Sequence, residues 1–233
     1  MDTINWITDV ANWLGNDGII FQVAIHLIYT CLSLAIAALI SVPLGIYVGH
    51  TGKGESLIVG SINTLRALPT LGLLILIVLL IAPLIHNNLA FVIPTVVVLV
   101  LLAAPPILSG VISGIRSIDN TVIDSARGIG FSTFQIVTKV ELPCALPLTL
   151  SGVRGATLQV VSTATVAAYV SLNGLGRFIL DGRAAGNYAE MAGGAVIIAV
   201  MAIFLEFFFA LLGRLITSPG ITRNTKRKPK RRI

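Results

Sequence analysis

Residues 124–143 read DSARGIGFSTFQIVTKVELP and form the longest amphiphilic interval of an otherwise very apolar chain. The interval carries charges of both signs, a glycine at Gly130 and a Leu-Pro pair at Leu142 and Pro143. We expect the Leu-Pro pair to stop a helix, because proline cannot supply the N–H that a continuing helix needs. In a membrane protein, a polar segment of this length on one side offers a surface to a soluble partner.

The composition places most of the chain in a membrane. Of its 233 residues, 55% are hydrophobic and 11% are charged, and the mean hydropathy is +0.94. Soluble domains carry about a quarter charged residues, so most of this apolar surface must face lipid or other membrane helices. The net charge of +6 does not indicate nucleic-acid binding, because much of it comes from RNTKRKPKRR at residues 223–232. A basic tail after a last apolar span is typical of a cytoplasmic anchor at anionic headgroups.

Five apolar runs are long enough to cross a bilayer core about 30 Å thick, which takes about 20 helical residues. We therefore expect an all-α polytopic membrane protein. The fourth run is rich in Ser, Thr, Gly and Ala, which membrane helices place at tight contacts, so we expect it to be buried among the others. The chain is predicted to divide into an N-terminal segment at 1–18, a transmembrane domain at 19–217 and a basic tail at 218–233. Within the transmembrane domain, a polar loop is predicted at about 117–145. The predicted spans are at about 21–48, 57–82, 90–112, 150–172 and 191–216.

The first 18 residues hold three Asp and no Lys or Arg, which excludes a signal peptide. Their apolar residues recur at helical spacing, which predicts a short amphipathic helix at the membrane interface, where Trp prefers to lie. A loosely ordered leader is the alternative. The residues that form the apolar face are Trp6, Ile7, Val10, Trp13 and Leu14.

Basic residues gather on one side of the predicted spans. The opposite side has only Arg177 and Arg183. The positive-inside rule therefore predicts an outside N-terminus and a cytoplasmic C-terminus, which requires an odd number of spans and places the amphiphilic interval in the cytoplasm. The basic residues of the cytoplasmic side, apart from the tail, are Lys53, Arg116, Arg127, Lys139 and Arg154.

Two charged residues lie inside apolar runs. Arg66 is about nine residues into the second run, so it is either a pathway residue or a side chain that reaches back to the interface. Glu206, in the middle of the last run, needs a polar partner or a wet environment. It can face either a pore or a neighbouring subunit.

No arrangement of residues indicates catalysis or metal binding. His26, His50 and His86 are scattered over the first third of the chain, with no Ser-His-Asp or paired-carboxylate pattern. Cys31 falls in an apolar run and Cys144 follows the polar interval, so we predict no disulfide and no metal site. We expect that the chain is not an enzyme.

The amphiphilic interval itself predicts two short helices. Asp119 or Asn120 can cap the first, and Gly130 is the expected left-handed turn. Ser132 and Gln135 stand three apart, the spacing of a capping box for a second helix. The two helices meet at an angle and form an elbow. The elbow either docks in a groove of a partner or is an ordinary interfacial loop.

The spacing of seven residues in the interval carries a family resemblance. It is similar to the EAA loop of ABC importer permeases, which reads Glu-Ala-Ala, three residues, Gly, nine residues, Ile, one residue, Leu-Pro. The chain departs from that pattern by Asp, Ser and Val in place of Glu, the first Ala and Ile. The resemblance implies that this loop couples to the nucleotide-binding subunit through Asp124, Ser125, Ala126, Gly130, Val140, Leu142 and Pro143.

The resemblance extends over residues 30–215. The stretch INTLRALPTL at 62–71 is similar to span two of these permeases, and TATVAA at 163–168 with GLG at 174–176 resembles the glycine betaine, choline and osmoprotectant branch. Methionine permeases share the five-span plan and the Gly-Leu-Gly stretch. The resemblance thus implies a permease of the bacterial cytoplasmic membrane for a compatible solute, with an amino acid such as methionine as the alternative.

Such a permease works with separate subunits. We expect an ABC ATPase that binds ATP and Mg, a second permease copy or paralogue, an extracytoplasmic solute-binding protein and membrane lipids, because the chain shows neither a Walker A glycine loop nor a fused capture domain. No cofactor is expected on this chain. A stand-alone channel or carrier, or a non-transporting scaffold, are the remaining alternatives.

A quaternary ammonium is usually held by aromatic faces, yet only 6% of the chain is aromatic. We therefore expect tight recognition in the binding protein and weak selection in the pore. The residues predicted to line the path are Pro69, Thr70, Thr163, Thr165 and Tyr169.

Overall fold

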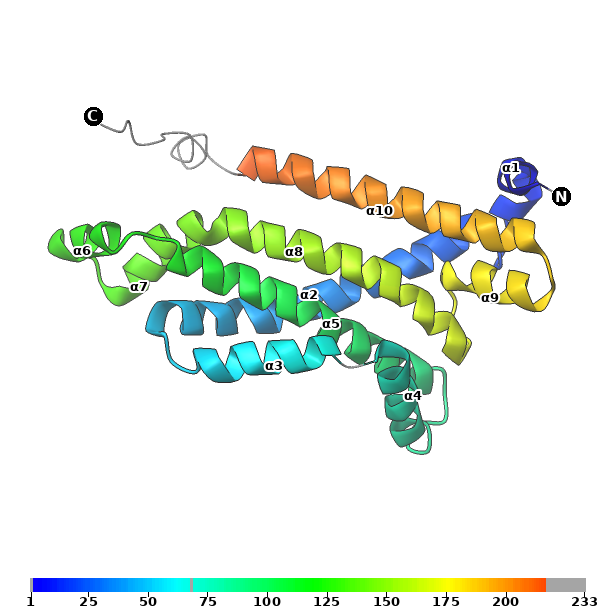
Figure 1. The fold of residues 1–233 in the computed structure, drawn as a ribbon, viewed down its shortest axis with the longest axis horizontal. Helices are drawn as coiled ribbons and strands as arrows, with labels where there is room; N and C mark the ends of the chain where they lie inside the picture. Colours follow the sequence, from blue (N-terminus) through cyan, green and yellow to red (C-terminus); the bar gives the residue numbers. More distant parts are fainter. Residues whose placement is uncertain (1, 68, 217–233) are drawn as a thin grey trace, which may run out of the picture.

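The computed structural model describes residues 2–67 and 69–216, and every regular element in those ranges is a helix. Figure 1 shows the long helices running along the longest axis of the molecule. The loop between α5 and α8 lies at one end, and the N-terminus lies with α9 at the other. The long helices are α2 (Ile19–Thr51), α5 (Leu89–Arg116), α8 (Leu142–Ala164) and α10 (Tyr188–Ile216).

Four helical stretches are long and apolar enough to cross a membrane. Three of them, α2, α5 and α10, agree with the predicted first, third and fifth spans to within a few residues. The fourth is a continuous helical stretch over Thr133–Val170, so the predicted fourth span begins inside the polar loop rather than after it. The basic tail predicted at 218–233 lies outside the described residues.

The predicted second span is divided. It consists of α3 (Glu55–Ala67) and the shorter apolar helix α4 (Thr70–Ile81), with Pro69 at the start of α4. Figure 1 shows α4 turned across the direction of α3. Proline removes a backbone donor, and Pro69 itself is extended, with φ −70° and ψ 112°, which explains the break. The count of five spans is therefore not confirmed, and the side chain of Arg66 lies outside the described residues.

The core forms where α2, α5 and α8 pack on one another. Ala37, Ala103 and Ala156, one from each helix, are fully buried. A Cβ added at Gly152 of α8 would lie 2.5 Å from the carbonyl oxygen of Pro106 on α5, so the two backbones approach as closely as glycine allows. Close approach over small residues is how membrane helices gain packing energy. The prediction that the fourth span is buried among the others is confirmed only in part, because 22% of its apolar window is buried, against 56% for α5. Ala156 and Gly152 make tight contacts, whereas the small residues Ser151, Gly155 and Ser162 are exposed.

The N-terminal segment is folded onto the protein. It forms α1 (Thr3–Thr8) and the 3-10 helix η1 (Val10–Trp13), where the sequence predicts one amphipathic helix. Trp6 is only 5% exposed and meets Phe178 edge to face, with ring centroids 5.3 Å apart. A Cβ at Gly193 of α10 would lie 2.3 Å from the Trp6 ring, so this indole needs a glycine beneath it. The protein, rather than a lipid headgroup, is therefore the partner of Trp6.

Candidate functional site

The first helix of the polar loop is α6 (Asn120–Gly128), and Asp119 caps it, as predicted. The carboxylate of Asp119 accepts a hydrogen bond from the backbone N–H of Thr121 at 2.9 Å and another from its hydroxyl at 2.8 Å. These bonds, the backbone one first, hold the pKa of Asp119 below its ordinary value. The helix start is thus fixed by a charged cap on the exposed surface.

A left-handed glycine ends α6. Gly130 has φ +90°, which confirms the predicted turn. The N–H of Phe131 donates to the carbonyl of Ala126 at 3.1 Å, and the N–H of Gly130 donates to that of Arg127 at 2.9 Å. This pair of bonds is the Schellman arrangement, which satisfies the last carbonyls of a helix. The direction of the chain after α6 therefore depends on a conformation that only glycine adopts without strain.

The predicted capping box opens the second helix, α7 (Thr133–Ile136). The N–H of Gln135 donates to the hydroxyl of Ser132 at 3.3 Å, and the N–H of Ser132 donates to the amide oxygen of Gln135 at 2.9 Å. The loop is thus two short helices joined at a glycine, the elbow that the sequence predicts.

The helix does not stop at Leu142 and Pro143, which corrects the sequence prediction. The helix α7 continues through a π-helical turn, η2 (Val137–Glu141), directly into α8, whose second residue is Pro143. Proline has no N–H for the carbonyl four residues earlier, and the wider π turn changes the bonding pattern at that point. The elbow is consequently in rigid helical continuity with a membrane helix.

The elbow presents apolar side chains outward. Ile129 is 75% exposed and Phe134 76% exposed. Large exposed apolar side chains beside a capped turn are typical of a surface that a partner covers. Of the seven motif residues, Ala126 is buried, Val140 and Leu142 are half-buried, and Asp124, Ser125, Gly130 and Pro143 are exposed.

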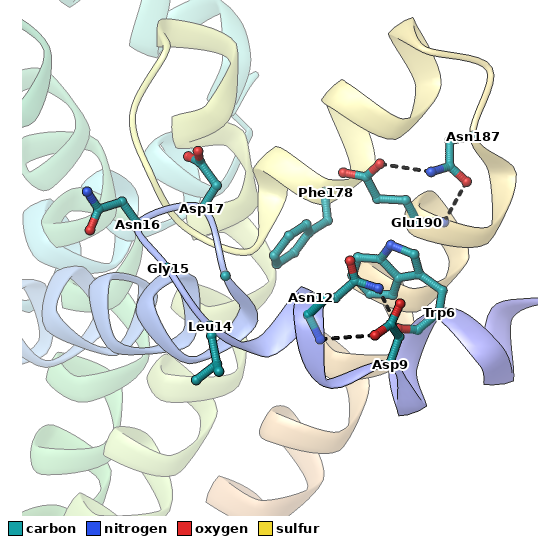
Figure 2. A pocket seen from close by; sticks show the side chains of 12 residues that line it. Trp6, Asp9, Asn12, Leu14, Gly15, Asn16, Asp17, Phe178, Asn187 and Glu190 are labelled. Carbon is teal, nitrogen blue, oxygen red and sulfur yellow. Dashed lines mark hydrogen bonds between the residues drawn. The ribbon is translucent and has the colours of Figure 1, made fainter.

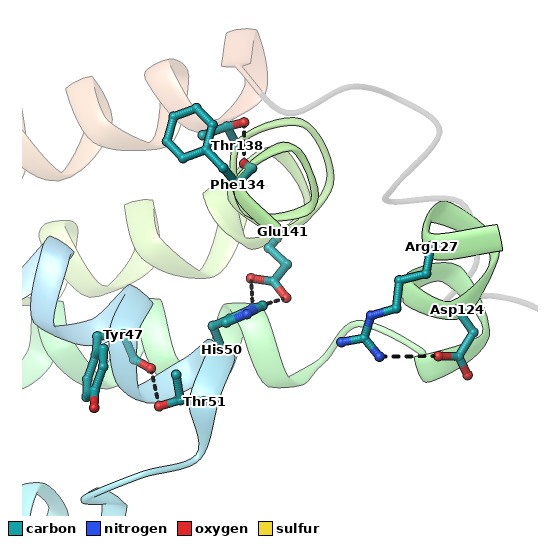
Figure 3. Close-up of polar contacts among 8 residues, drawn as sticks. All are labelled: Tyr47, His50, Thr51, Asp124, Arg127, Phe134, Thr138 and Glu141. Atoms are coloured by element: carbon teal, nitrogen blue, oxygen red, sulfur yellow. Dashed lines mark hydrogen bonds and ion pairs between the residues drawn. The ribbon is translucent and has the colours of Figure 1, made fainter. Parts of the chain in front are cut away.

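Two side-chain contacts of very different burial lie at this end, and Figure 3 draws both. The Nδ1 atom of His50, at the end of α2, lies 2.8 Å from a carboxylate oxygen of Glu141 in the π turn, and the Glu141 side chain is 6% exposed. Asp124 and Arg127 of α6 approach only to 3.8 Å, and both side chains are more than half exposed. The buried pair ties the elbow to α2, whereas the exposed pair stays within the elbow. A cavity of about 460 Å³ lies between the two pairs.

Only some of the predicted path residues lie together near the break in the second span. Thr70, at the start of α4, and Thr163, at the end of α8, line one cavity of about 10 Å³, which holds about one water molecule. Thr165 and Tyr169 lie in the 3-10 helix η3 (Thr165–Val170), and Tyr169 is 54% exposed. Pro69 is exposed at the start of α4. The structure brings Thr70 to Thr163 and leaves the other three outside this cavity.

Glu206 finds its polar partner on the neighbouring helix. Its carboxylate forms an ion pair with Arg154 of α8, which joins α8 to α10. The sequence predicts the need for a partner and does not identify Arg154. A side-chain pair of opposite charge is the usual way for a membrane helix to carry a buried charge.

A second hollow lies at the opposite end of the bundle, and Figure 2 shows the residues that line it. Its volume is about 490 Å³, and Trp6 and Phe178 form its apolar wall. Asp9, Asp17 and Glu190 also line it. Sequence patterns did not predict this hollow, because its walls come from the N-terminal segment, α9 (Gly176–Ala184) and the start of α10.

Known proteins share this arrangement. The family model described as "Binding-protein-dependent transport system inner membrane component" matches residues 41–218. The chain belongs to this family. It is a membrane-embedded permease subunit of an ABC importer.

Relatives of the permease are named for osmoprotectants. It is 30% identical to the choline transport system permease protein OpuBB of Bacillus subtilis, over 85% of this chain and 88% of that protein. It is 28% identical to the osmoprotectant import permease protein OsmW of Salmonella typhimurium, over 95% of this chain and 100% of that protein. A solved structure of the MetNI methionine ABC transporter matches with a TM-score of 0.73 and 23% identity, over 85% of this chain and 96% of the matched one. At that identity the structural likeness shows the fold alone.

Proposed function

We propose that this permease forms the pore of an ATP-driven importer for a quaternary-ammonium compatible solute such as glycine betaine, carnitine or choline. The observation that carries the proposal is the set of relatives: permeases named for choline, for glycine betaine, carnitine and choline, and for osmoprotectants align over at least 85% of the chain. The agreement between Thr163–Ala168 and that branch supports the same substrate class.

The ATPase acts on the permease at the elbow. Two permeases form one pore, and an ABC ATPase, which binds ATP and Mg, covers the exposed Phe134 and Ile129 of each. Closure of the ATPase dimer pushes the elbow. The push reaches α8 through the continuous π turn and reaches α2 through the bond between His50 and Glu141. A rigid lever between two packed states is the element that such coupling needs.

The remaining assignments follow from charge and composition. The elbow end faces the cytoplasm, because Lys and Arg gather there, and the N-terminus lies outside. A separate solute-binding protein delivers the solute to the far end. Selection inside the membrane is weak, since aromatic residues make up 6% of the chain. Thr70, Thr163 and Tyr169 belong to the path, with Pro69 and Thr165.

Reconstitution in proteoliposomes tests this proposal. The permease is incorporated together with its partner ATPase and binding protein, and uptake of radiolabelled choline, glycine betaine, carnitine and methionine is measured with and without ATP. We expect ATP-dependent uptake of at least one of the three quaternary amines. The matched control is an ATPase that binds ATP without hydrolysing it.

The other possible outcomes would support a different function. Uptake of methionine alone would assign the permease to amino acids. Flux down a gradient without any ATPase would indicate a channel. Complete absence of flux with a folded, ATPase-bound permease would overturn the proposed substrate class.

A further inference from the structure

The head of α2 carries two buried polar side chains that bond to a distant turn. Gln22 is 2% exposed and His26 is fully buried, and they stand one helical turn apart. The amide oxygen of Gln22 accepts a hydrogen bond from the N–H of Gly174 at 2.5 Å. The Nδ1 atom of His26 accepts one from the N–H of Leu175 at 3.3 Å. We call these two side chains the α2 clasp.

The clasp also bonds to the end of α8. The Nε2 atom of His26 lies 3.0 Å from the carbonyl oxygen of Val161. A carbonyl oxygen only accepts, so Nε2 carries the hydrogen and Nδ1 is the acceptor that Leu175 requires. One neutral tautomer satisfies both bonds. Together the two side chains bond to three backbone groups that are about 135 to 152 residues away in the chain.

The backbone that the clasp holds is irregular. After Val161, the chain passes through η3 and a turn in which Ser171 has φ +60° and Gly174 has φ +134°. A Cβ at Gly176 would lie 2.1 Å from the carbonyl oxygen of Thr165, so the turn folds tightly back on η3. At membrane depth, non-helical backbone is tolerated only where protein or water satisfies it. The clasp supplies that satisfaction for Gly174 and Leu175.

The segment between these bonds carries three of the predicted path residues, Thr163, Thr165 and Tyr169. It lies at the end of the bundle away from the elbow (Figure 1). A cavity of about 230 Å³ adjoins the clasp, with Gln22 in its wall beside Arg177. A polar side chain in this place thus borders both the turn and a solvent-sized space.

The same helix is fastened at its other end. α2 has 33 residues, about 50 Å of helix, and His50 near its last turn bonds to Glu141 of the elbow. One helix therefore bonds to the elbow at one end and to the path segment at the other. Burying a polar side chain costs free energy unless it is bonded. Apolar side chains would fill the same space without that cost, so packing alone does not explain why Gln22 and His26 are polar.

We propose that Gln22 and His26 are positioning residues that lock the segment Val161–Leu175, with its path residues, to α2, so that this end of the path moves with α2 when the elbow is pushed. The proposal rests on the importer function above. It predicts that breaking the clasp releases the segment and uncouples ATP hydrolysis from uptake, while the elbow still binds its ATPase.

Cysteine labelling tests the proposal. In a background with Cys31→Ser and Cys144→Ser, Tyr169→Cys reports on the segment through its reaction rate with a membrane-impermeant maleimide. Gln22→Met removes one acceptor at similar size, and His26→Phe removes both ring bonds. We expect either change to alter the labelling rate of Tyr169→Cys about tenfold, the effect of leaving a buried N–H unsatisfied, and to lower uptake per ATP hydrolysed.

Two further variants separate positioning from general damage. Gln22→Glu keeps the acceptor oxygen and should restore labelling toward the parent value. His86→Phe makes the same exchange at an exposed histidine of the α4–α5 connection and should change nothing. If His26→Phe does not fold, Gln22→Met alone must change the labelling rate about tenfold and lower uptake per ATP hydrolysed.

Parent-like labelling and coupling in a folded Gln22→Met protein would overturn the proposal, and so would an equal effect of His86→Phe. Failure of the proposed function is distinguishable, because it would appear as absent uptake in the parent protein itself. The labelling measurement needs no solute and remains informative in that case.

Discussion

The two ends of the bundle differ in what they bury. The elbow end turns Ile129 and Phe134 outward and buries the Glu141 carboxylate against His50. The far end hides Trp6 and two neutral polar side chains, Gln22 and His26, and satisfies these two with backbone groups of the same chain. Exposed apolar side chains do not separate the two ends, because Ile4 and Val10 of the far end are 74% and 68% exposed. The difference lies in the buried polar groups: at the elbow end they join two side chains, and at the far end they hold an irregular backbone turn. Under the proposed function, force enters at the elbow end and moves the turn at the far end.

The largest expected effect tests the elbow end. We predict that Phe134→Ala weakens binding of the ATPase by about 30-fold or more, because truncating an aromatic anchor at the centre of an interface costs about 2 kcal/mol or more. Affinity is measured by titrating purified ATPase onto the permease in nanodiscs.

Phe207→Ala is the matched control. Phe207, on α10, is 71% exposed, close to the 76% of Phe134, and lies in an apolar membrane-length helix. It should leave the ATPase affinity unchanged. Equal losses from both variants would show that exposure of a phenylalanine, rather than its place on the elbow, governs the result, and the comparison of the two ends would fail.

The elbow was predictable because its signals are local. A cap at Asp119, a left-handed turn at Gly130 and the box of Ser132 with Gln135 are each set by residues within five positions of one another. The long spans were predictable for a related reason, since length and hydropathy decide them. The error at Pro143 arose because a π turn allows a helix to continue where an α-helical pattern would end.

The clasp and the pair of Arg154 with Glu206 were not predictable, because their partners are far apart in the chain. His26 meets Val161 and Leu175, and Glu206 meets Arg154, only after the helices pack. A signal for the clasp did exist: the polar residues of α2 recur at helical spacing inside an apolar run, which marks a buried polar face. The polar members of that face are Gln22, His26, Thr30, Ser33 and Ser41.

The second prediction compares two side-chain contacts at the elbow end. Glu141→Ala should destabilise the permease by about 1–3 kcal/mol, because it leaves the half-buried His50 without its partner. Arg127→Ala breaks the exposed pair and should cost less than about 1 kcal/mol. Unfolding of both variants is measured in the same detergent by thermal and denaturant titration.

A double-mutant cycle sharpens this result. The combined variant His50→Ala with Glu141→Ala should lose less than the sum of the two single losses, since each single change already breaks the bond. Strict additivity would mean that the two side chains act independently. In that case α2 would not be fastened to the elbow, and only α8 would carry the push.

The smallest effect concerns two glycines two residues apart. No atom lies within 4 Å of a Cβ added at Gly128 or at Gly130, so an alanine meets open space at either position. Only Gly130 has a positive φ, +90°, where an alanine costs about 1–2 kcal/mol. We predict that Gly130→Ala lowers ATPase affinity by about 5- to 30-fold and that Gly128→Ala, at the last residue of α6, does not. The same titration in nanodiscs measures both.

Because the space around the two positions is equivalent, a difference between them isolates the backbone conformation of the elbow as the property that the partner requires. Equal affinities would show that the partner reshapes the elbow on binding, and the elbow end would then be adaptable rather than preformed.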